Sequence, residues 1–279
     1  MPQKTTISRR VFSRALLAAP ALSLVPMLAP SAARANPGRF FSQFGGSGDP
    51  DHSAWTGMLK RHVKVGGDGI NRVNYRAFKA DQAALKAYIQ SLAAVPARNL
   101  SKDAAFAYWV NLYNAVTIDV VLDHYPVRSI RDIRLGGGGL FGRGPWKANL
   151  VTVEGQALSL DNIEHDILRP IWRDPRIHYA VNCASIGCPN LDVTAFTSRG
   201  LGGRLDAAAV KYVNHPRGVR FANGGLRASK IYSWFSEDFG GASGLVGHWM
   251  PYAQPELQQK LRSSPRVSGY DYDWALNDV

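Results

Sequence analysis

The chain has 279 residues, a formal net charge of +12 at pH 7, 46% hydrophobic residues and 19% charged residues. This balance excludes a wholly disordered chain, a collagen-like repeat and a long coiled coil. Two cysteines are too few for a disulfide-dense small protein, and a chain of this length buries enough surface to fold without such a framework.

The first 35 residues have the features of an export signal. Ser8 to Phe12 reads SRRVF and resembles the twin-arginine export motif, an apolar stretch follows at 15–29, and residues 33–35 form an A-x-A cleavage site. The apolar stretch is short for a membrane span and contains two prolines, which favours a cleaved signal over a retained anchor. The general secretion route and a retained anchor are the alternatives. We therefore expect a periplasmic protein whose mature chain begins at Asn36.

Removal of this segment changes the charge of the protein. Residues 1–35 hold five of the 33 Lys and Arg and none of the 21 Asp and Glu, so the mature chain has a net charge of +7. That value favours loose attraction to anionic polymers of the envelope over specific binding of nucleic acid. No second long apolar run follows, which predicts no membrane span in the mature chain. No motif for a cofactor is present, and we expect none.

The first half of the mature chain is predicted to be helical. Residues 36–50 are rich in Gly, Ser and Phe and indicate a flexible tether. Apolar residues at helical spacing then predict three helices, with a glycine turn at 66–69 between the first two and Ser101 as the N-cap of the last. Their expected ranges are 51–63, 73–92 and 102–124.

The helix over 102–124 is predicted to be buried, because it is apolar on most of its sides. Asn111 and Asn114 lie inside it, and a buried amide without a partner costs about 1–3 kcal/mol. Either these amides make structural hydrogen bonds to neighbouring loops, or they form the polar floor of a binding cleft. The cleft would also include Tyr113, His178 and Asn182.

A glycine-rich loop, Gly136 to Gly144, separates the two halves of the chain. We expect a mobile surface loop. The alternatives are a lid with glycine hinges and an anion-binding loop that uses Arg134, Arg143 and Lys147.

The second half of the chain alternates short strands with helices. Asp161 and Glu164 have the spacing of a capping box, which predicts a helix as far as Pro170. The complete set of expected elements is a hairpin at 150–158, a helix at 161–170, a strand at 176–182, a helix at 204–213, a strand at 219–221 and helices at 229–239 and 245–252. Together these predict an α+β fold: a mostly helical single domain over residues 51–279, around a buried central helix, with a small, mainly antiparallel sheet.

Four stretches of the chain resemble the bacterial and plant family called domain of unknown function 547. They are Ala107 to Ala115 (AYWVNLYNA), Leu158 to His165 (LSLDNIEH), His178 to Pro189 (HYAVNCASIGCP) and Tyr272 to Asn277 (YDWALN). They occur in the family's order over most of the mature chain. The family name records no established activity, so the resemblance implies motif positions and no catalytic role.

Both cysteines lie in one of these stretches, with four residues between Cys183 and Cys188. This spacing is not that of a zinc knuckle and no matching histidine pair follows, so we expect no metal. Three interpretations remain: a disulfide, two buried inert thiols, and a reactive thiolate at Cys183. If the domain is exported folded, it folds where thiols stay reduced, and a disulfide cannot be essential for folding.

Two histidines are candidate bases. His165 follows Glu164 and lies one turn from Asp161, positions that can orient an imidazole. The simpler interpretation, which we favour, is a surface histidine beside a Glu164 that only closes the capping box. His178 lies on the expected strand 176–182, whose alternation places its side chain on the face opposite Cys183. We therefore interpret His178 as a core histidine bonded to backbone, unless the strand ends early.

Two functions follow from these residues. The favoured one is a binding module whose cleft holds an envelope peptide, glycan or protein partner. The alternative is a periplasmic hydrolase or acyl transferase, with Cys183 as nucleophile, His165 or His178 as base, and Asn111, Asn114 or Asn182 as orienting groups. A free thiol at Cys183, facing a pocket that also holds an imidazole, would favour the enzyme.

The export signal gives a direct prediction. Replacement of Arg9 and Arg10 by Lys should leave the protein in the cytoplasm, because the paired arginines are what the twin-arginine route recognises. Cell fractionation measures the export, and N-terminal sequencing of the wild-type periplasmic protein should begin at Asn36. A normal periplasmic yield of the double variant would contradict this route.

Overall fold

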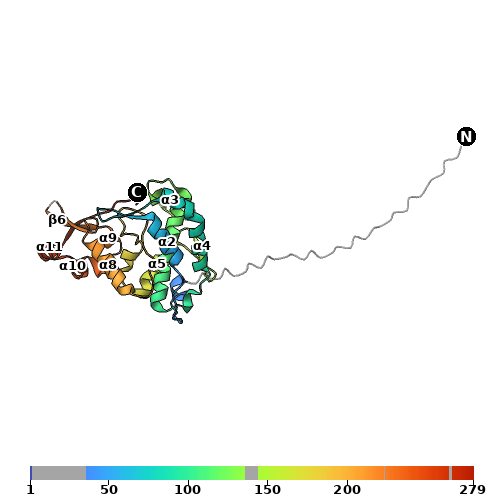
Figure 1. The fold of residues 1–279 in the computed structure, drawn as a ribbon, viewed down its shortest axis with the longest axis horizontal. Coiled ribbons are helices and arrows are strands. Elements are labelled where there is room, and N and C mark those ends of the chain that lie inside the picture. Colours follow the sequence, from blue (N-terminus) through green and yellow to red (C-terminus); the bar gives the residue numbers. More distant parts are fainter. Residues whose placement is uncertain (2–35, 136–143, 223, 264–265) are drawn as a thin grey trace. The chain divides into compact units, whose positions relative to one another are not determined.

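The computed structural model describes Met1 and residues 36–279, except for 136–143, 223 and 264–265 (Figure 1). The predicted signal peptide and nearly all of the glycine-rich loop lie outside the described residues, so both stay predictions. Ala35 to Val279 form one compact unit.

The first half of this unit is helical, as predicted, with one small antiparallel pair of strands between its helices. The helices are α1 (Pro37–Phe40), α2 (Ser53–His62), α3 (Tyr75–Phe78), η1 (Lys79–Asp81), α4 (Gln82–Ala93), η2 (Ala97–Asn99) and α5 (Lys102–His124). The strands are β1 (Val63–Val65) and β2 (Asn71–Val73).

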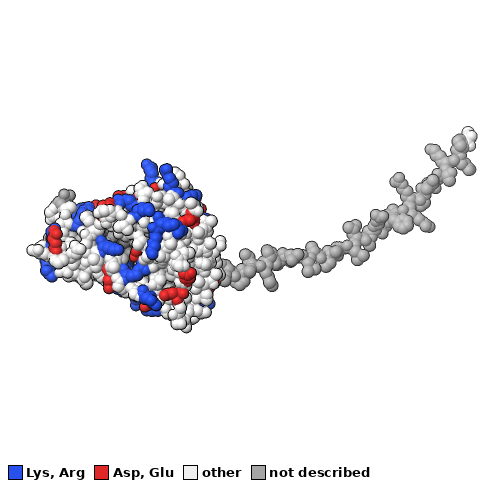
Figure 2. All heavy atoms as spheres, viewed as in Figure 1, with Lys and Arg blue, Asp and Glu red and all other residues white. Residues whose placement is uncertain are grey.

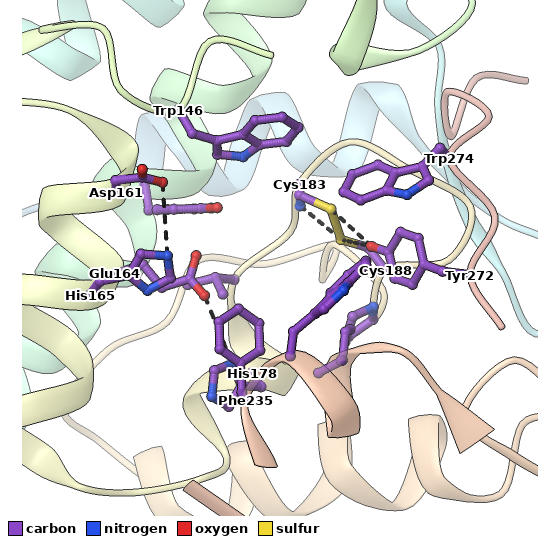
Figure 3. A pocket seen from close by; sticks show the side chains of 15 residues that line it. Trp146, Asp161, Glu164, His165, His178, Cys183, Cys188, Phe235, Tyr272 and Trp274 are labelled. Atoms are coloured by element: carbon purple, nitrogen blue, oxygen red, sulfur yellow. Dashed lines mark hydrogen bonds and ion pairs between the residues drawn. A yellow bond between two sulfur atoms is a disulfide. The ribbon is translucent and has the colours of Figure 1, made fainter. Parts of the chain in front are cut away.

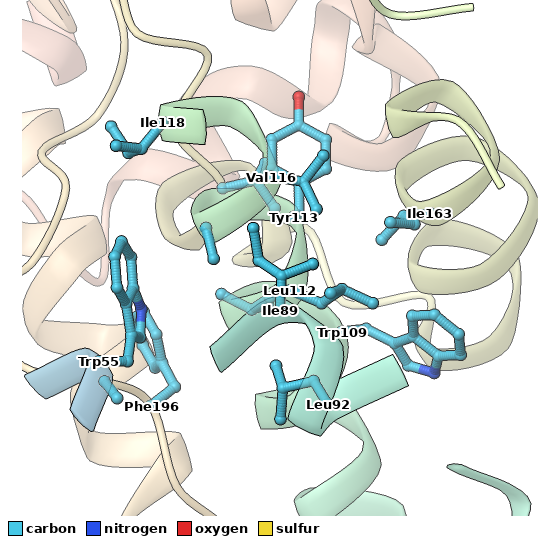
Figure 4. Packing of buried hydrophobic residues seen from close by; sticks show 14 of the residues in the cluster. Trp55, Ile89, Leu92, Trp109, Leu112, Tyr113, Val116, Ile118, Ile163 and Phe196 are labelled. Atoms are coloured by element: carbon cyan, nitrogen blue, oxygen red, sulfur yellow. The ribbon is translucent and has the colours of Figure 1, made fainter. Parts of the chain in front are cut away.

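Helix α5 is the centre of the fold. Its predicted range and cap are confirmed: it spans Lys102–His124, and the Ser101 side chain accepts a hydrogen bond from the Ala104 N–H. Within the described residues α5 is the helix long and apolar enough to cross a membrane, and 94% of its most apolar window is buried inside the protein. Figure 4 shows its large side chains, such as Trp109 and Leu112, packed among residues from the surrounding elements. The apolar character of α5 therefore serves the core.

The predicted tether is partly wrong. Residues 37–40 form α1, and the next residue, Phe41, is 1% exposed and packs edge-on against Trp109 of α5 at 4.8 Å between ring centroids. The Phe44 ring packs against Trp172 in a tilted arrangement, with 5.5 Å between the ring centroids. The phenylalanines that made this segment look unusual in the sequence thus attach it to the domain.

The hairpin expected at 150–158 is confirmed. Strands β3 (Val151–Val153) and β4 (Gln156–Leu158) are antiparallel, and both turn residues, Glu154 and Gly155, have positive φ angles of 45° and 76°. A two-residue turn of this kind follows the natural twist of the paired strands.

The helix after this hairpin begins differently from the prediction. Asn162–Leu168 is a π-helix, η4, which continues as α6 (Arg169–Trp172). The capping box is made by Ser159 and Asn162, because the Ser159 Oγ accepts from the Asn162 N–H and the Asn162 Oδ1 accepts from the Ser159 N–H. Asp161 and Glu164, predicted to form the box, are thereby left with their carboxylates directed elsewhere.

The strand predicted at 176–182 is wrong. Ile177–Ala180 form one helical turn, α7, and the chain becomes extended only at Val181. The Asp174 carboxylate accepts from the Arg176 N–H at 2.9 Å, and Pro175 occupies the next position. An Asp followed by Pro is a helix start, and this local signal overrides the apolar alternation of the segment.

The rest of the chain packs a second apolar cluster against a three-stranded sheet. Helix α8 (Leu201–Val213) confirms the predicted helix with three further residues at its start, and β5 (Val219–Ala222) confirms the predicted strand. The helix expected from Ser229 begins later, because that residue ends a strand. The remaining elements are β6 (Gly225–Ser229), α9 (Ile231–Trp234), η5 (Ser236–Phe239), α10 (Gly241–Trp249), α11 (Pro255–Ser263) and β7 (Val267–Asp271).

The α+β class with a buried central helix is confirmed. In the described part of the chain the strands form three small sheets instead of one, and the pairing is antiparallel except between β6 and β7, which are parallel. Lys and Arg side chains are spread over the face drawn in Figure 2 and outnumber the acidic ones there, in keeping with the positive net charge.

Candidate functional site

A pocket of about 180 Å³ opens beside the cysteine segment (Figure 3). Its walls come from segments far apart in the sequence: α5, the π-helix η4, α7, the cysteine segment, α9 and the C-terminal residues. It has an acidic side with two histidines, a side formed by the cysteines, and an aromatic side.

The acidic side comes mainly from η4. Asp161, Glu164 and His165 all line the pocket, and the His165 Nε2 lies 3.8 Å from the Asp161 Oδ1. The predicted pairing of His165 with Asp161 across one turn is therefore present. Burial raises the pKa of Asp161, and the neighbouring His165 opposes that rise. π-Helical turns are rare and are often found at functional sites.

Glu164, which precedes His165 in the chain, is 8% exposed and lines the pocket. Tyr113 of α5 also lines the pocket, and burial raises the pKa of its hydroxyl well above its usual range, with the Glu164 carboxylate adding to the effect. Tyr113 therefore stays a neutral phenol, able to donate a hydrogen bond.

His178 lies between two carboxylates. Its Nε2 is 2.6 Å from the Asp238 Oδ2, its Nδ1 is 3.8 Å from the Glu164 Oε1, and its ring stacks on Phe235 at 4.3 Å. The side chain is 2% exposed. The expectation of a core histidine bonded to backbone is thus corrected, because its partners are acidic side chains. Its place in the pocket wall follows from the helical turn of α7, which the predicted strand would not give.

Asp238 is the fixed charge behind this histidine. It also accepts two hydrogen bonds from the guanidinium of Arg169, at 2.6 and 3.1 Å. Burial alone would raise the pKa of Asp238, but the hydrogen bonds from His178 and Arg169 outweigh it and hold that pKa well below its usual value. Asp238 is therefore ionised, and it orients His178 toward the pocket.

Cys183 and Cys188 form a disulfide, which confirms one of the three interpretations of the pair. The cysteines line the pocket together, yet Cys188 is 3% exposed whereas Cys183 is half-buried. The Tyr272 hydroxyl lies 3.0 Å from the Cys183 sulfur and 3.2 Å from the Cys188 sulfur. In this state Cys183 is not a free thiol, although the pocket does hold imidazoles.

The C-terminal segment fixes the cysteine segment in place. The Ile186 N–H donates to the Ala275 carbonyl and the Gly187 N–H to the Asp273 carbonyl, both at 2.8 Å. A Cβ added to Gly187 would lie 2.8 Å from the Asp273 carbonyl oxygen, so only glycine allows this close approach.

The three candidate asparagines have backbone partners and do not line the pocket. Asn111 donates to the Phe196 carbonyl and accepts from its N–H, and Asn114 does the same with the Ala180 carbonyl and the Asn182 N–H. The Asn182 side chain donates to the Pro189 carbonyl and accepts from the Ala184 N–H. The expectation that these amides form the polar floor of the cleft is therefore wrong, because they hold the walls from behind. Of the α5 residues expected in the cleft, Tyr113 is the one that lines the pocket.

The aromatic side was not predicted. Three aromatic rings surround Trp274 on this side of the pocket. Their centroids lie 5.8 Å from that of Trp274 for Trp146, 5.5 Å for Trp234 and 4.7 Å for Tyr272. Figure 3 shows the Trp146 and Trp274 rings on either side of Cys183. The alternation Tyr-Asp-Trp at 272–274 could have indicated two aromatic rings on one face of an extended chain.

The described lining of the pocket contains two carboxylates and two imidazoles but neither Lys nor Arg. Two cations lie outside this lining, because Arg131 stacks over the Trp274 ring and Arg169 over the Phe235 ring. Across the described ranges, no group of His, Cys, Asp and Glu has the arrangement of a metal site.

Residues 97–213 match the model of the family described as "Protein of unknown function, DUF547". The match runs from η2 to the end of α8, so it supports the predicted resemblance for three of the four stretches and does not reach 272–277. No curated protein and no solved structure matches the chain. The matched region supplies the acidic and cysteine sides of the pocket, whereas Trp234, Tyr272 and Trp274 lie beyond it.

The bonding of Asp238 predicts how stability depends on pH. Folding lowers the pKa of the Asp238 carboxylate below its ordinary value of 3.8. The ionised carboxylate therefore stabilises the folded protein at pH values above 3.8, and this stabilisation is lost as the pH falls through the lower pKa of the folded state. Asp238→Asn should therefore be less stable than wild type at pH 7, and the difference should shrink below pH 3.8. Urea unfolding over a pH series measures it.

The control for this series is Glu256→Gln, at a carboxylate that is 82% exposed. It should change stability little at any pH. A gap between Asp238→Asn and wild type that stays constant from neutral to acid pH would contradict the assignment.

Proposed function

We propose that the protein is an exported periplasmic binding module whose pocket holds a sugar ring of an envelope glycan. The observation that carries this proposal is the meeting of three tryptophans and a tyrosine with two carboxylates around one small pocket.

The two groups of side chains match the two kinds of surface on a sugar. The C–H faces of a sugar ring are apolar and pack well against indole rings, whereas its hydroxyls point outward around the edge and donate hydrogen bonds to carboxylates. Trp234 and Trp274 supply ring faces, and Asp161 and Glu164 supply acceptors from the opposite side. The volume of about 180 Å³ suits one ring.

The rim of the pocket favours a chain of sugars over a single one. Trp234 is 45% exposed, which is unusual for the largest apolar side chain, and it lies next to Tyr272 at 4.9 Å. An exposed indole at the mouth offers a platform for the sugar that follows the bound ring. A folded protein partner would need a larger and flatter surface than this pocket provides.

Binding is favoured over acyl transfer by the state of the candidate catalytic groups. Cys183 is bridged, and Asn111, Asn114 and Asn182 are occupied by backbone groups, so neither nucleophile nor oxyanion donor is available as the alternative requires. The two histidines remain as hydrogen-bonding side chains of the pocket wall.

The proposed site of action is supported by the first 35 residues, which have the pattern of a twin-arginine signal followed by a cleavage site. A mature chain of net charge +7 would be held near anionic envelope polymers without a membrane anchor. We propose that the domain folds before export and that its disulfide forms in the periplasm.

The binding proposal predicts that Trp234→Ala weakens glycan binding about tenfold, a change of about 1.4 kcal/mol, because the exposed stacking face is lost. Calorimetric titration with soluble fragments of the envelope glycans measures it. Trp234→Phe should retain part of the affinity, since an aromatic face remains.

The matched control is Val210→Ala, at another exposed apolar side chain, on α8 and away from the pocket. It should bind as wild type does. Equal affinity of the Trp234→Ala variant and wild type, or no binding of any fragment by wild type, would contradict the proposed function.

A further inference from the structure

The disulfide has an uneven exposure that a purely structural bridge does not need. Cys188 is 3% exposed, whereas Cys183 is half-buried, and both cysteines line a pocket open to solvent. Thiol–disulfide exchange begins when a thiolate attacks a disulfide sulfur that it can reach. Cys183 offers the more accessible sulfur, and Cys188 is then the sulfur that leaves.

Polar groups are placed to hold the sulfurs as thiolates. The hydroxyls of Tyr272 and Ser185 lie 3.0 and 3.2 Å from the Cys183 sulfur, and the Cys183 N–H donates to the Cys188 sulfur at 2.9 Å. Hydrogen bonds of this kind stabilise the charged form of a thiol and thereby lower its pKa.

The segment that bears the cysteines is held by bonds that do not involve the disulfide. The N–H groups of Ile186 and Gly187 donate to the C-terminal segment, and the Asn114 side chain accepts from the Asn182 N–H. Opening the bridge therefore removes one constraint among several. The segment can keep its shape in both redox states, which a reversible reaction requires.

The backbone between the two cysteines is strained. Ala184 has a φ of 58°, in the left-handed region that a residue with a Cβ rarely adopts. Its N–H bonds to the Asn182 Oδ1, and its carbonyl accepts from the Asn277 N–H. Strain that the surrounding structure holds in place is typical of functional segments.

We infer that Cys183 and Cys188 are a redox-active pair that exchanges with small thiols in the pocket. The thiolate of a small thiol attacks the Cys183 sulfur, a mixed disulfide forms there, and the Cys183–Cys188 bond breaks. Cys188 leaves as a thiolate beside the Tyr272 hydroxyl and the Cys183 N–H. A second thiol molecule then attacks the mixed disulfide and leaves as a small disulfide. The pair gains two electrons and two protons, which the two thiols lose.

The charge of the pocket selects the class of thiol. The carboxylates of Asp161 and Glu164 line the pocket, whereas Arg131 and Arg169 stack over its rings from outside the described lining. An aminothiol, which carries a positive charge, should therefore enter more readily than an anionic thiol such as glutathione. This order is the reverse of what the net charge of the protein would give.

The test uses the two single variants of the full mature chain, with cystamine as the probe. Cys188→Ser leaves the reachable sulfur, and Cys183→Ser leaves the protected one. Mass spectrometry follows formation of the mixed disulfide under native conditions. Cys188→Ser should react at least about tenfold faster than Cys183→Ser, because the thiolate must be accessible to react. Equal rates would overturn the inference.

Tyr272 is a positioning residue, and its effect is read from a pH profile. Burial raises the pKa of Tyr272, the Glu164 carboxylate adds to the rise and the Arg217 guanidinium opposes it; both charged groups are kept in the variants compared. In the Cys188→Ser background, Tyr272→Phe should shift the midpoint of the reaction to higher pH, because the thiolate loses a hydrogen bond. An unshifted midpoint would refute the role of this hydroxyl. A merely structural loss would lower the rate at all pH values and leave the midpoint in place.

The charge preference is tested with the same variant. The rates at which Cys188→Ser reacts with cystamine and with glutathione disulfide are each divided by the rate of free cysteine with the same reagent. The normalised rate with cystamine should exceed that with glutathione disulfide, and the ratio of the two should fall when Glu164→Gln is added. A ratio of one would show that exchange does not occur inside the acidic pocket and would contradict the assigned substrate class.

Wild-type protein provides the test that does not depend on folding of the variants. Dithiothreitol should reduce the bridge while the far-ultraviolet circular dichroism stays native, and removal of the reductant with added cystamine should restore it. Reduction only together with unfolding would show a structural bridge and overturn the inference. Glycan binding by Trp234→Ala is a separate readout, so the two proposals can fail independently.

Discussion

The structure depends on the pairing of two buried amides. Asn111 and Asn114 are 1% and 3% exposed on a helix that is otherwise apolar on nearly every side, and each must find a donor and an acceptor inside the protein. Both do so with backbone, at Phe196 and at the pair Ala180 and Asn182. Helix α5 therefore holds two segments of the chain, one at Phe196 and one where α7 ends.

The pocket is built outward from these contacts. Asn182, held through its N–H by α5, binds the Pro189 carbonyl and the Ala184 N–H with its own side chain, so it closes the cysteine segment on itself. The C-terminal residues then bond to Ile186 and Gly187. The disulfide and Tyr272 are thus brought together by backbone bonding, and the proposed ligand and thiol chemistry share a wall that these hydrogen bonds hold in place.

Caps, turn residues and short spacings in the sequence predicted the elements whose structure depends on residues close in the chain. Ser101 and the apolar pattern after it gave the limits of α5, the turn residues gave the hairpin at 150–158, and the spacing of the cysteines allowed the bridge that forms. The segment 176–182 shows where a competing local signal was missed. Its apolar alternation suggested a strand, but Asp174 and Pro175 begin a helical turn, which brings His178 to Asp238 and Glu164.

The aromatic side of the pocket could not be predicted from spacing, because its members meet only in the folded chain. Trp146 and Trp274 are 128 positions apart and touch through tertiary packing alone. Likewise, Arg169 and Asp238 are 69 positions apart, and no short sequence pattern indicates that their side chains form an ion pair. Residues of this kind carry the proposed function, whereas the residues that stood out in the sequence, such as Asn111, support the framework behind it.

If the buried amides of α5 hold the pocket segment, Asn114→Leu should lower the free energy of unfolding. The leucine removes the partners of the Ala180 carbonyl and the Asn182 N–H, and two buried backbone groups are left unpaired. We predict a loss of about 1–3 kcal/mol relative to Asn99→Leu, at an exposed asparagine of η2. A loss no larger than that of Asn99→Leu would show that this amide does not hold the segment.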